Sequence, residues 1–464
     1  MSVPPARLFA LLVLLGVLFS AAELLRSPFL HADGEFVDLR ALWCAGRAVD
    51  QHADPYRVEP ERTCQQASAI ETLRDSPNLV MSFVLPGYDA AGAALLALLP
   101  LRVAIAVFVT LALAALLAAV AVLVRVLDVP APLAVASLAF SAGYPSLTLG
   151  QLGAFEIFAI VGAAAALHAG RDRWAGVLAA ATLIEPHLGG FIGLAVLAYA
   201  PRARVAYLLG AAALLVLAVA ATGPVAQLHY LLHELPQQAL AEARQDQQYS
   251  ATFIATALGI PIPAALTLGA LSTVVMLGVA LVLARRLGTR ERAAVVLLPA
   301  ACAVCGGVYL HYAQIAVAIP AALVLFGLAR TPRERILAGV GVVLLAIPWY
   351  DVALVKQLLA PALTTLAVLV WSLTGGSVRA VAAAVVACWL VLTPLENRPP
   401  AAPPPPVVGR LPGDASATLV WLDASRSIGQ PDLWHVAVKV PTWLGLIALL
   451  IAAGTIGWER PRAR

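Results

Sequence analysis

The chain has 464 residues, of which 61% are hydrophobic and 12% charged, and its mean hydropathy is +0.88. Because soluble domains are typically about 45–50% apolar and about 25% charged, this composition excludes an ordinary soluble protein and predicts a polytopic membrane protein. The net charge of +4 resides in short loops, where membrane topology explains it without a nucleic-acid partner.

Apolar runs near the roughly 17–25 residues that cross a bilayer recur along the chain. The first, LFALLVLLGVLFSAAELL, is interpreted as a retained span, although a cleaved signal peptide is the alternative. Further candidate spans lie near residues 102–124, 131–148, 153–169, 174–199, 203–222, 264–285, 292–309, 312–329, 335–350, 353–373, 378–394 and 441–458. The expected fold class is all-α, a transmembrane helical bundle of about 12–14 spans with interfacial helices on its outer side.

Compact basic loops separate many of these runs, and positive loops stay on the cytoplasmic side of a membrane. They are Arg125, 170–173, 201–204, 284–292, 329–335, Arg379 and 459–464. The outer face then carries three larger segments, 27–82, 223–263 and 395–440, provided that residues 83–100 lie along the interface. Residues 174–199 carry Glu185-Pro186 in their middle, which predicts two short helices that meet at a break.

This pattern predicts three parts of the chain. Residues 1–394 form the transmembrane core, with 27–100 as a first outer loop that contains interfacial helices and 223–263 as a second. Residues 395–440 form a Pro-rich outer segment whose PPAAPPPP run is a stiff spacer. Residues 441–464 form the last span and a basic cytoplasmic tail.

The cysteines and the absent motifs add little. Cys44 and Cys64 both fall in the first outer segment, where a disulfide is allowed but is not required by spacing. Cys302 and Cys305 lie inside a span, where we interpret them as small packing residues rather than as a redox pair. Because the sequence contains no HExxH, paired CxxC or P-loop motif, no metal site is predicted.

An acid stands among apolar residues shortly after the first apolar run. If residues 36–49 are helical, the 3.6-residue period places Asp38 on an apolar stripe with Leu42 and Ala45, opposite Arg40 and Arg47. A buried, unpaired carboxylate is costly or has a raised pKa, so this placement favours a functional acid. The alternative is a helix N-cap, but the Glu or Gln that a capping box places three residues later is missing.

Several weak motifs then follow in one order. An aspartate-led stretch runs from Asp38 to Arg47, and Asp54-Pro55-Tyr56, a Pro-containing interfacial segment, Gly150-Gln151 before a span, and a helix broken at Pro186 follow it. This order resembles glycosyltransferase family 87, a group of polyprenyl-phosphate-sugar-dependent membrane transferases of the GT-C superfamily. The resemblance covers roughly residues 1–330.

The resemblance implies a hexosyltransferase of the cell membrane whose active site lies on the non-cytoplasmic face. It implies that Asp38 is the general base, with Asp33 and Glu35 as fallback bases. The donor would be a polyprenyl-phosphate sugar, with mannose favoured, and the acceptor a hydroxyl group on a lipid or glycan. Membrane lipids are the remaining expected partner, no cofactor is assigned, and a divalent cation stays open.

Other polar groups at the outer ends of spans complete the expected site. Gln151 is expected to bind sugar hydroxyls, and a polar helix end that meets lipid headgroups is the alternative. His311 and Tyr312 are expected near phosphate, although an interfacial aromatic belt predicts the same tyrosine. Arg244 is expected to bind phosphate through its guanidinium group, and a solvated surface helix is the alternative.

One position departs from the family, which commonly has Lys-Pro where this chain has Glu185-Pro186-His187. Either His187 supplies the missing cation, or the donor differs, or this member has lost activity. Two other classes therefore stay open. A secondary transporter would also contain a broken helix, and a non-catalytic lipid- or glycan-binding protein of the same fold would keep the architecture.

Overall fold

The computed structural model describes residues 9–10, 13–19, 36–68, 78–396, 409–426 and 429–458. Within these ranges the chain is helical throughout and forms no strand, and its extended pairing is confined to two isolated bridges. The predicted all-α class is therefore confirmed. Asp33 and Glu35, the fallback bases, lie outside the described residues.

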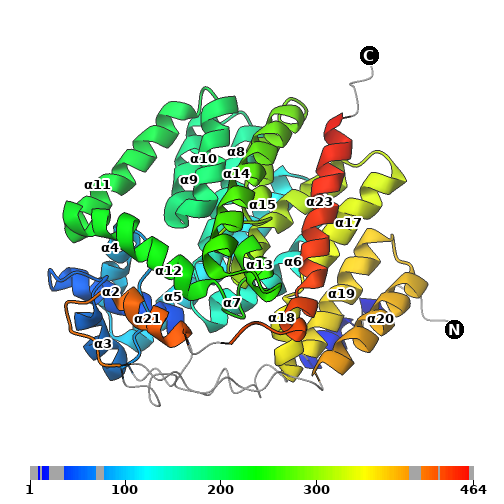
Figure 1. The fold of residues 1–464 in the computed structure, drawn as a ribbon. Coiled ribbons are helices and arrows are strands. Elements are labelled where there is room, and N and C mark those ends of the chain that lie inside the picture. Colours follow the sequence, from blue (N-terminus) through cyan, green and yellow to red (C-terminus); the bar gives the residue numbers. More distant parts are fainter. Residues whose placement is uncertain are drawn as a thin grey trace.

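Long and medium apolar helices form the body of the molecule (Figure 1). They are α5 (Leu101–Val126), α6 (Ala131–Ser141), α7 (Gly143–Thr148), α8 (Gly153–His168), α9 (Asp172–Ala181), α10 (Pro186–Tyr199), α11 (Arg204–His229), α14 (Ile262–Leu287), α15 (Ala294–Ala303), α16 (Ile319–Leu328), α17 (Pro332–Leu345), α18 (Trp349–Leu354), α19 (Leu359–Leu373), α20 (Val378–Glu396) and α23 (Val440–Trp458). Three 3₁₀ segments, Thr182–Ile184, Tyr312–Ala318 and Lys356–Leu358, connect some of them.

Shorter helices, several of them polar, form the outer segments. They are α2 (Val37–Asp50), α3 (Val58–Ala67), α4 (Gly87–Ala97), α12 (Leu235–Glu242), α13 (Ala251–Ala257), α21 (Ala417–Ser425) and α22 (Leu433–Ala437). A π-helical turn, Tyr230–Glu234, joins α11 to α12. Helix α4 has 11 residues and is therefore about 16 Å long, which is too short to cross a bilayer.

Five helical stretches of the described chain are long and apolar enough to span a membrane: Leu101–Val126, Arg204–Glu242, Ile262–Leu287, Lys356–Leu373 and Leu433–Trp458. Several other apolar helices are shorter, because breaks divide them. The predicted break in 174–199 is found, since α9 ends in a 3₁₀ turn and α10 begins at Pro186. These apolar helices support a membrane protein.

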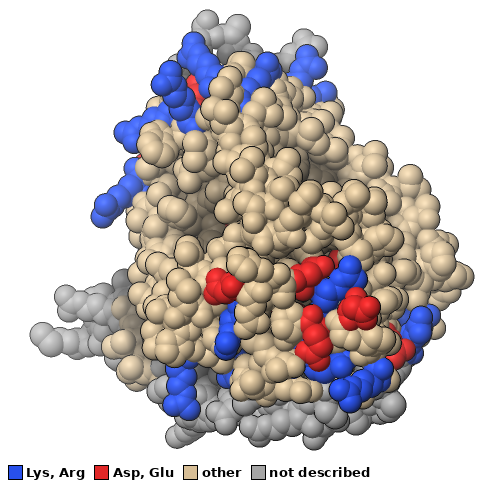
Figure 2. Space-filling view, turned by 90° about the vertical axis from the view of Figure 1, so that its left-hand side faces the viewer, with Lys and Arg blue, Asp and Glu red and all other residues tan. Residues whose placement is uncertain are grey.

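The basic loops gather at the end opposite the short outer helices. The α10–α11 and α14–α15 connections lie at the top of Figure 1, as does the end of α23, whereas α2, α3 and α21 lie at the lower left. Figure 2 shows Lys and Arg side chains at both ends of one face, with a broad uncharged surface between them. Few acids accompany those at the upper end, whereas those at the lower end are mixed with Asp and Glu. A predominantly basic end is what the positive-inside pattern predicts for the cytoplasmic side.

Helix α2 is buried on more than the apolar face that its sequence predicts. Trp43 lies opposite the apolar stripe, yet it is only 8% exposed and its Nε1 donates to the Leu99 carbonyl at 3.2 Å. Arg40 donates to the Ser68 carbonyl, and Arg47 is the exposed arginine that stands over the Trp43 ring. The helix is covered on both sides because α3 and α4 pack against it.

A disulfide between Cys44 and Cys64 joins α2 to α3, so the pairing that the sequence left open is present. It encloses a sequence separation of 20 residues, and the chain-entropy model gives such a loop roughly 3 kcal/mol of stabilisation.

We expect Cys44 and Cys64 of the purified protein to resist a polyethylene-glycol maleimide until a reductant is added. The measurement is a gel-mobility shift in a Cys302→Ala/Cys305→Ala/Cys388→Ala background, which removes the cysteines that are free in the structure. Two added labels after reduction and none before would match the structure. Full labelling without reductant would contradict it.

The Asp54-Pro55-Tyr56 motif is structural. The Asp54 carboxylate accepts hydrogen bonds from the Tyr56 backbone N–H at 3.0 Å and from Arg57 Nε at 3.1 Å. The Tyr56 hydroxyl donates to the Leu85 carbonyl at 3.1 Å, and its ring stacks on Tyr230 with 5.2 Å between centroids. Tyr56 is fully buried, so this motif joins the first outer segment to the helix that follows α11.

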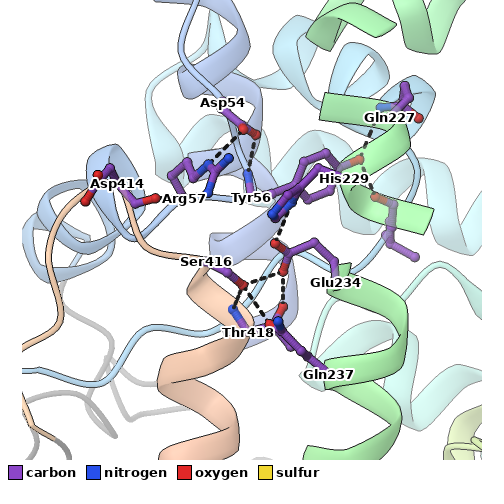
Figure 3. A network of polar contacts seen from close by, with 11 residues as sticks. Asp54, Tyr56, Arg57, Gln227, His229, Glu234, Gln237, Asp414, Ser416 and Thr418 are labelled. Carbon is purple, nitrogen blue, oxygen red and sulfur yellow. Dashed lines mark hydrogen bonds and ion pairs between the residues drawn. The ribbon is translucent and has the colours of Figure 1, made fainter. Parts of the chain in front are cut away.

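The segment that follows the Pro-rich run is bound to the same network (Figure 3). Buried Glu234 accepts a hydrogen bond from Ser416 Oγ at 2.8 Å and another from Thr418 Oγ1. His229 Nδ1 lies 3.1 Å from the second oxygen of Glu234. The region 409–426 is therefore part of the outer layer.

Candidate active site

Asp38 lies in the first turn of α2, where the loop between α7 and α8 meets this helix. The backbone N–H groups of Asp38 and Leu39 both donate to the Leu149 carbonyl, at 3.1 and 3.3 Å, and Phe36 N donates to the Thr148 carbonyl at 2.9 Å. Phe36 is the N-cap residue and no side chain caps the helix. Asp38 thus makes no capping bond, and its half-buried carboxylate is available for another role.

The Gly150-Gln151 pair is built around Asp38. Gln151 Nε2 donates to Asp38 Oδ2 at 2.8 Å. Gly150 has a φ of 78°, and a Cβ at this position would lie 2.4 Å from the Leu39 Cβ. Only glycine allows both this backbone conformation and this close approach to α2. The glycine therefore brings the loop onto α2, and the glutamine orients the carboxylate.

Burial raises the pKa of the Asp38 carboxyl to about 6, and the Gln151 hydrogen bond partly opposes this rise. Desolvation disfavours the charged carboxylate, whereas an N–H donor stabilises it. A carboxyl group with this pKa is mostly ionised at pH 7 and remains basic enough to accept a proton. Asp38 therefore has the ionisation properties of a general base.

We expect Gly150→Ala to lower the rate of a reaction that uses Asp38 about tenfold, while Gly92→Ala leaves this rate unchanged. An added Cβ at Gly150 must displace Leu39 or the loop, and a left-handed φ costs a non-glycine residue about 1–2 kcal/mol; Gly92 has open space around it. Initial rates at matched protein levels test this. Equal activity of the two variants would mean that the loop does not position Gln151.

The Glu185-Pro186-His187 segment lies at the break between α9 and α10. Glu185 occupies the N-cap position of α10 but its side chain makes no capping hydrogen bond. Instead, Glu185 Oε2 accepts a hydrogen bond from Gln314 Nε2, and His187 Nε2 lies 3.7 Å from the same oxygen. The charge of Asp38 also acts on Glu185. The acid that departs from the family pattern thus lies within electrostatic reach of Asp38.

Residues 309–312 run beside the second outer segment. An isolated bridge pairs Gln248 with His311, and Tyr312 N donates to the Gln247 carbonyl at 3.0 Å. The Tyr309 ring lies 6.0 Å from the His187 ring and 6.3 Å from the His311 ring. His187, Tyr309 and His311 therefore form a row of rings. The Tyr312 ring lies 5.3 Å from the His311 ring, and Tyr312 is only 8% exposed.

His311 cannot act as a cation near neutral pH. Burial, assisted by the positive charge of Lys439, lowers the pKa of its imidazole to about 4. Its Nδ1 is buried and has no hydrogen-bond partner among the described residues. His311 can therefore contribute a neutral imidazole hydrogen bond to a ligand.

Arg244 follows α12 and is partly buried. Its Nε is buried and has no hydrogen-bond partner in the described part of the chain. An arginine without a protein partner can pair with a phosphate group through its fork of N–H donors. Among the described residues, no hydrogen bond or ion pair links Arg244 to Asp38, and its place in the site is a prediction.

Several functional-site candidates were not singled out from the sequence. Gln314 bridges two site elements, because its Oε1 accepts from His311 N at 2.8 Å while its Nε2 donates to Glu185. Glu156 is fully buried in the first turn of α8, and neither of its oxygens has a partner among the described residues. A lone acid in an apolar span is a recognisable signal, so Glu156 could have been found five residues after Gln151.

Glu242 and Lys439 extend the polar region toward the last span. Glu242 accepts from Trp421 Nε1 at 2.7 Å and from Gln248 Nε2 at 3.1 Å. Lys439 is fully buried, donates to the Gln248 carbonyl at 2.9 Å and lies 3.4 Å from the centroid of the Phe253 ring. Lys439 thus connects the start of the last long helix to the second outer segment without reaching solvent.

Across the described ranges, no group of three or more His, Cys, Asp or Glu side chains has a geometry that could hold a metal ion.

Comparison with protein families gives one match, in which residues 86–262 fit the model of Glycosyltransferase family 87. The matched region contains α4 to α13 and includes Gln151, His187 and Arg244. Neither the curated proteins nor the solved structures contain a match to this chain. The resemblance predicted from the sequence is confirmed, and the match indicates a membrane glycosyltransferase.

Proposed function

We propose that this membrane glycosyltransferase moves a hexose, with mannose favoured, from a polyprenyl-phosphate donor to a hydroxyl group of a lipid or glycan acceptor. The observation that carries the proposal is the Asp38 carboxylate, which is held by Gln151 at 2.8 Å and has a pKa raised to about 6. The family match over residues 86–262 supports the reaction class.

The chemistry assigned to Asp38 is general base catalysis. The acceptor oxygen attacks the anomeric carbon, its proton passes to the free oxygen of the Asp38 carboxylate, and the bond between the anomeric carbon and the phosphate oxygen breaks. The bonding electrons leave with the lipid phosphate. Asp38 Oδ2 is occupied by Gln151, which leaves Oδ1 to take the proton.

The leaving phosphate gains negative charge, so the site needs donors or cations beside it. We assign this role to Arg244, whose Nε has no partner among the described residues, and to His187 and His311. The row of His187, Tyr309 and His311 rings offers N–H and O–H donors along one surface. Tyr312 is assigned to packing behind this row because it is buried.

We place the reaction on the non-cytoplasmic face of the cell membrane. Asp38 and the disulfide lie among the outer helices, at the end opposite the basic loops. A disulfide is favoured in an oxidising compartment, and basic loops are favoured on the cytoplasmic side. Both arguments support the same orientation.

The test is transfer of radiolabelled sugar from a panel of polyprenyl-phosphate hexoses to membrane lipids and glycans, with the purified protein in vesicles. Transfer from one or more panel donors, and none from nucleotide sugars, would support the donor class. Transfer from nucleotide sugars alone would contradict it. The non-catalytic alternative predicts binding of a donor, by retention on the vesicles, without any transfer.

A further inference from the structure

A cavity of about 1080 Å³ opens at the basic end of the molecule, far along the chain from Asp38 and formed by other elements. It lies between the α8–α9 loop with the first turn of α9 and the α10–α11 loop with the first turns of α11. Its volume is slightly above the roughly 300–1,000 Å³ that is typical of ligand pockets.

Three arginines line this cavity: Arg171, Arg173 and Arg202. All three are exposed, and within the described part of the chain none of their side chains makes a hydrogen bond or an ion pair. Asp172, the acid in the lining, is buried and its carboxylate is paired with Arg292. The cavity therefore presents three uncompensated positive charges.

The remaining wall of the cavity is apolar and faces outward. Trp174, Val205 and Leu209 line it, and each has 66% of its side chain exposed. Val205 and Leu209 lie one turn apart on α11, which is among the stretches long enough to span a membrane. The arginines lie next to an apolar wall that runs along a spanning helix. A phospholipid has the same order of groups, with a charged headgroup next to apolar acyl chains.

We propose that this cavity binds an anionic glycerophospholipid of the adjoining leaflet. Its phosphate and headgroup lie against the three arginines, and the upper parts of its acyl chains lie on Trp174, Val205 and Leu209. Arginine suits this role because its planar guanidinium binds phosphate oxygens in pairs. Basic pockets at the cytoplasmic ends of spanning helices are general sites for such headgroups.

Trp174 provides a reporter inside the proposed site. The full-length protein is reconstituted in phosphatidylcholine vesicles that contain acyl-brominated phosphatidylglycerol or, at the same mole fraction, acyl-brominated phosphatidylcholine. The chain has nine tryptophans. The difference in fluorescence between wild type and Trp174→Phe gives the signal of Trp174 alone. We expect an apparent affinity about tenfold higher for the anionic lipid.

A matched pair of triple variants tests the arginines. Arg171→Gln/Arg173→Gln/Arg202→Gln should remove the preference, whereas Arg125→Gln/Arg285→Gln/Arg333→Gln, which removes three basic-loop charges outside the cavity, should retain it. Equal quenching of wild type by the two lipids would overturn the proposal, and this result needs no arginine variant to fold. Equal loss in both triple variants, or displacement by millimolar inorganic phosphate alone, would also overturn it.

Discussion

Asp38→Asn should lower the kcat of sugar transfer about 10²–10⁴-fold. The amide keeps the size of the side chain but cannot accept the acceptor's proton. Gln151 can still donate to the amide oxygen, so the packing of α2 against the Gly150-Gln151 loop is preserved. The measurement is the initial rate of transfer at saturating donor, with the amount of folded protein determined by gel filtration in detergent.

Asp50→Asn is the matched control for this variant. Asp50 lies at the other end of α2 and is exposed, so its loss changes the charge of the same helix without touching the loop. We expect wild-type activity. Full activity of Asp38→Asn would remove Asp38 as the base and leave Asp33 and Glu35 as candidates. Loss of activity in both variants would point to the charge of the helix rather than to a single carboxylate.

The rate of transfer should fall about a hundredfold between pH 7 and pH 4, with the midpoint of the acid limb near pH 6. The pKa of Asp38 is raised to about 6 by burial, and only the ionised form accepts a proton. Activity is therefore present above this pKa and declines as the pH falls through it. A profile of kcat against pH, with stability checked at each pH, tests this expectation.

Gln151→Leu tests whether the acid limb is due to Asp38 or to another titrating group. The substitution removes the N–H donor that stabilises the carboxylate, so the acid limb should move to higher pH. The charges of Glu185 and Glu242 also interact with Asp38. Glu185→Gln and Glu242→Gln should therefore shift the acid limb only slightly. Asp38→Asn should eliminate the acid limb. An unchanged limb in the residual activity of Asp38→Asn would assign the titration to another group.

Local sequence patterns determined much of the fold. Runs of apolar residues predicted the helices, and Pro186 predicted the start of α10. The basic loops predicted which helix ends lie together on one side of the bundle. These features depend on residues that are close together in the chain, since hydropathy, loop charge and proline geometry act locally. The acid at position 38 was also visible as an exception to its local pattern.

The tertiary structure decided what surrounds that acid. Gln151 is 113 residues from Asp38 along the chain, and Gln314 is 129 residues from Glu185. The Ser416–Glu234 hydrogen bond joins residues that are 182 positions apart, which makes the later part of the Pro-rich segment a component of the outer layer. Neither periodicity nor composition predicts such contacts, because the arrangement of helices in a bundle is set by packing between distant segments. The sequence alone thus identified a candidate base and its membrane setting. Only the folded chain supplied the partner that orients this carboxylate and the burial that raises its pKa.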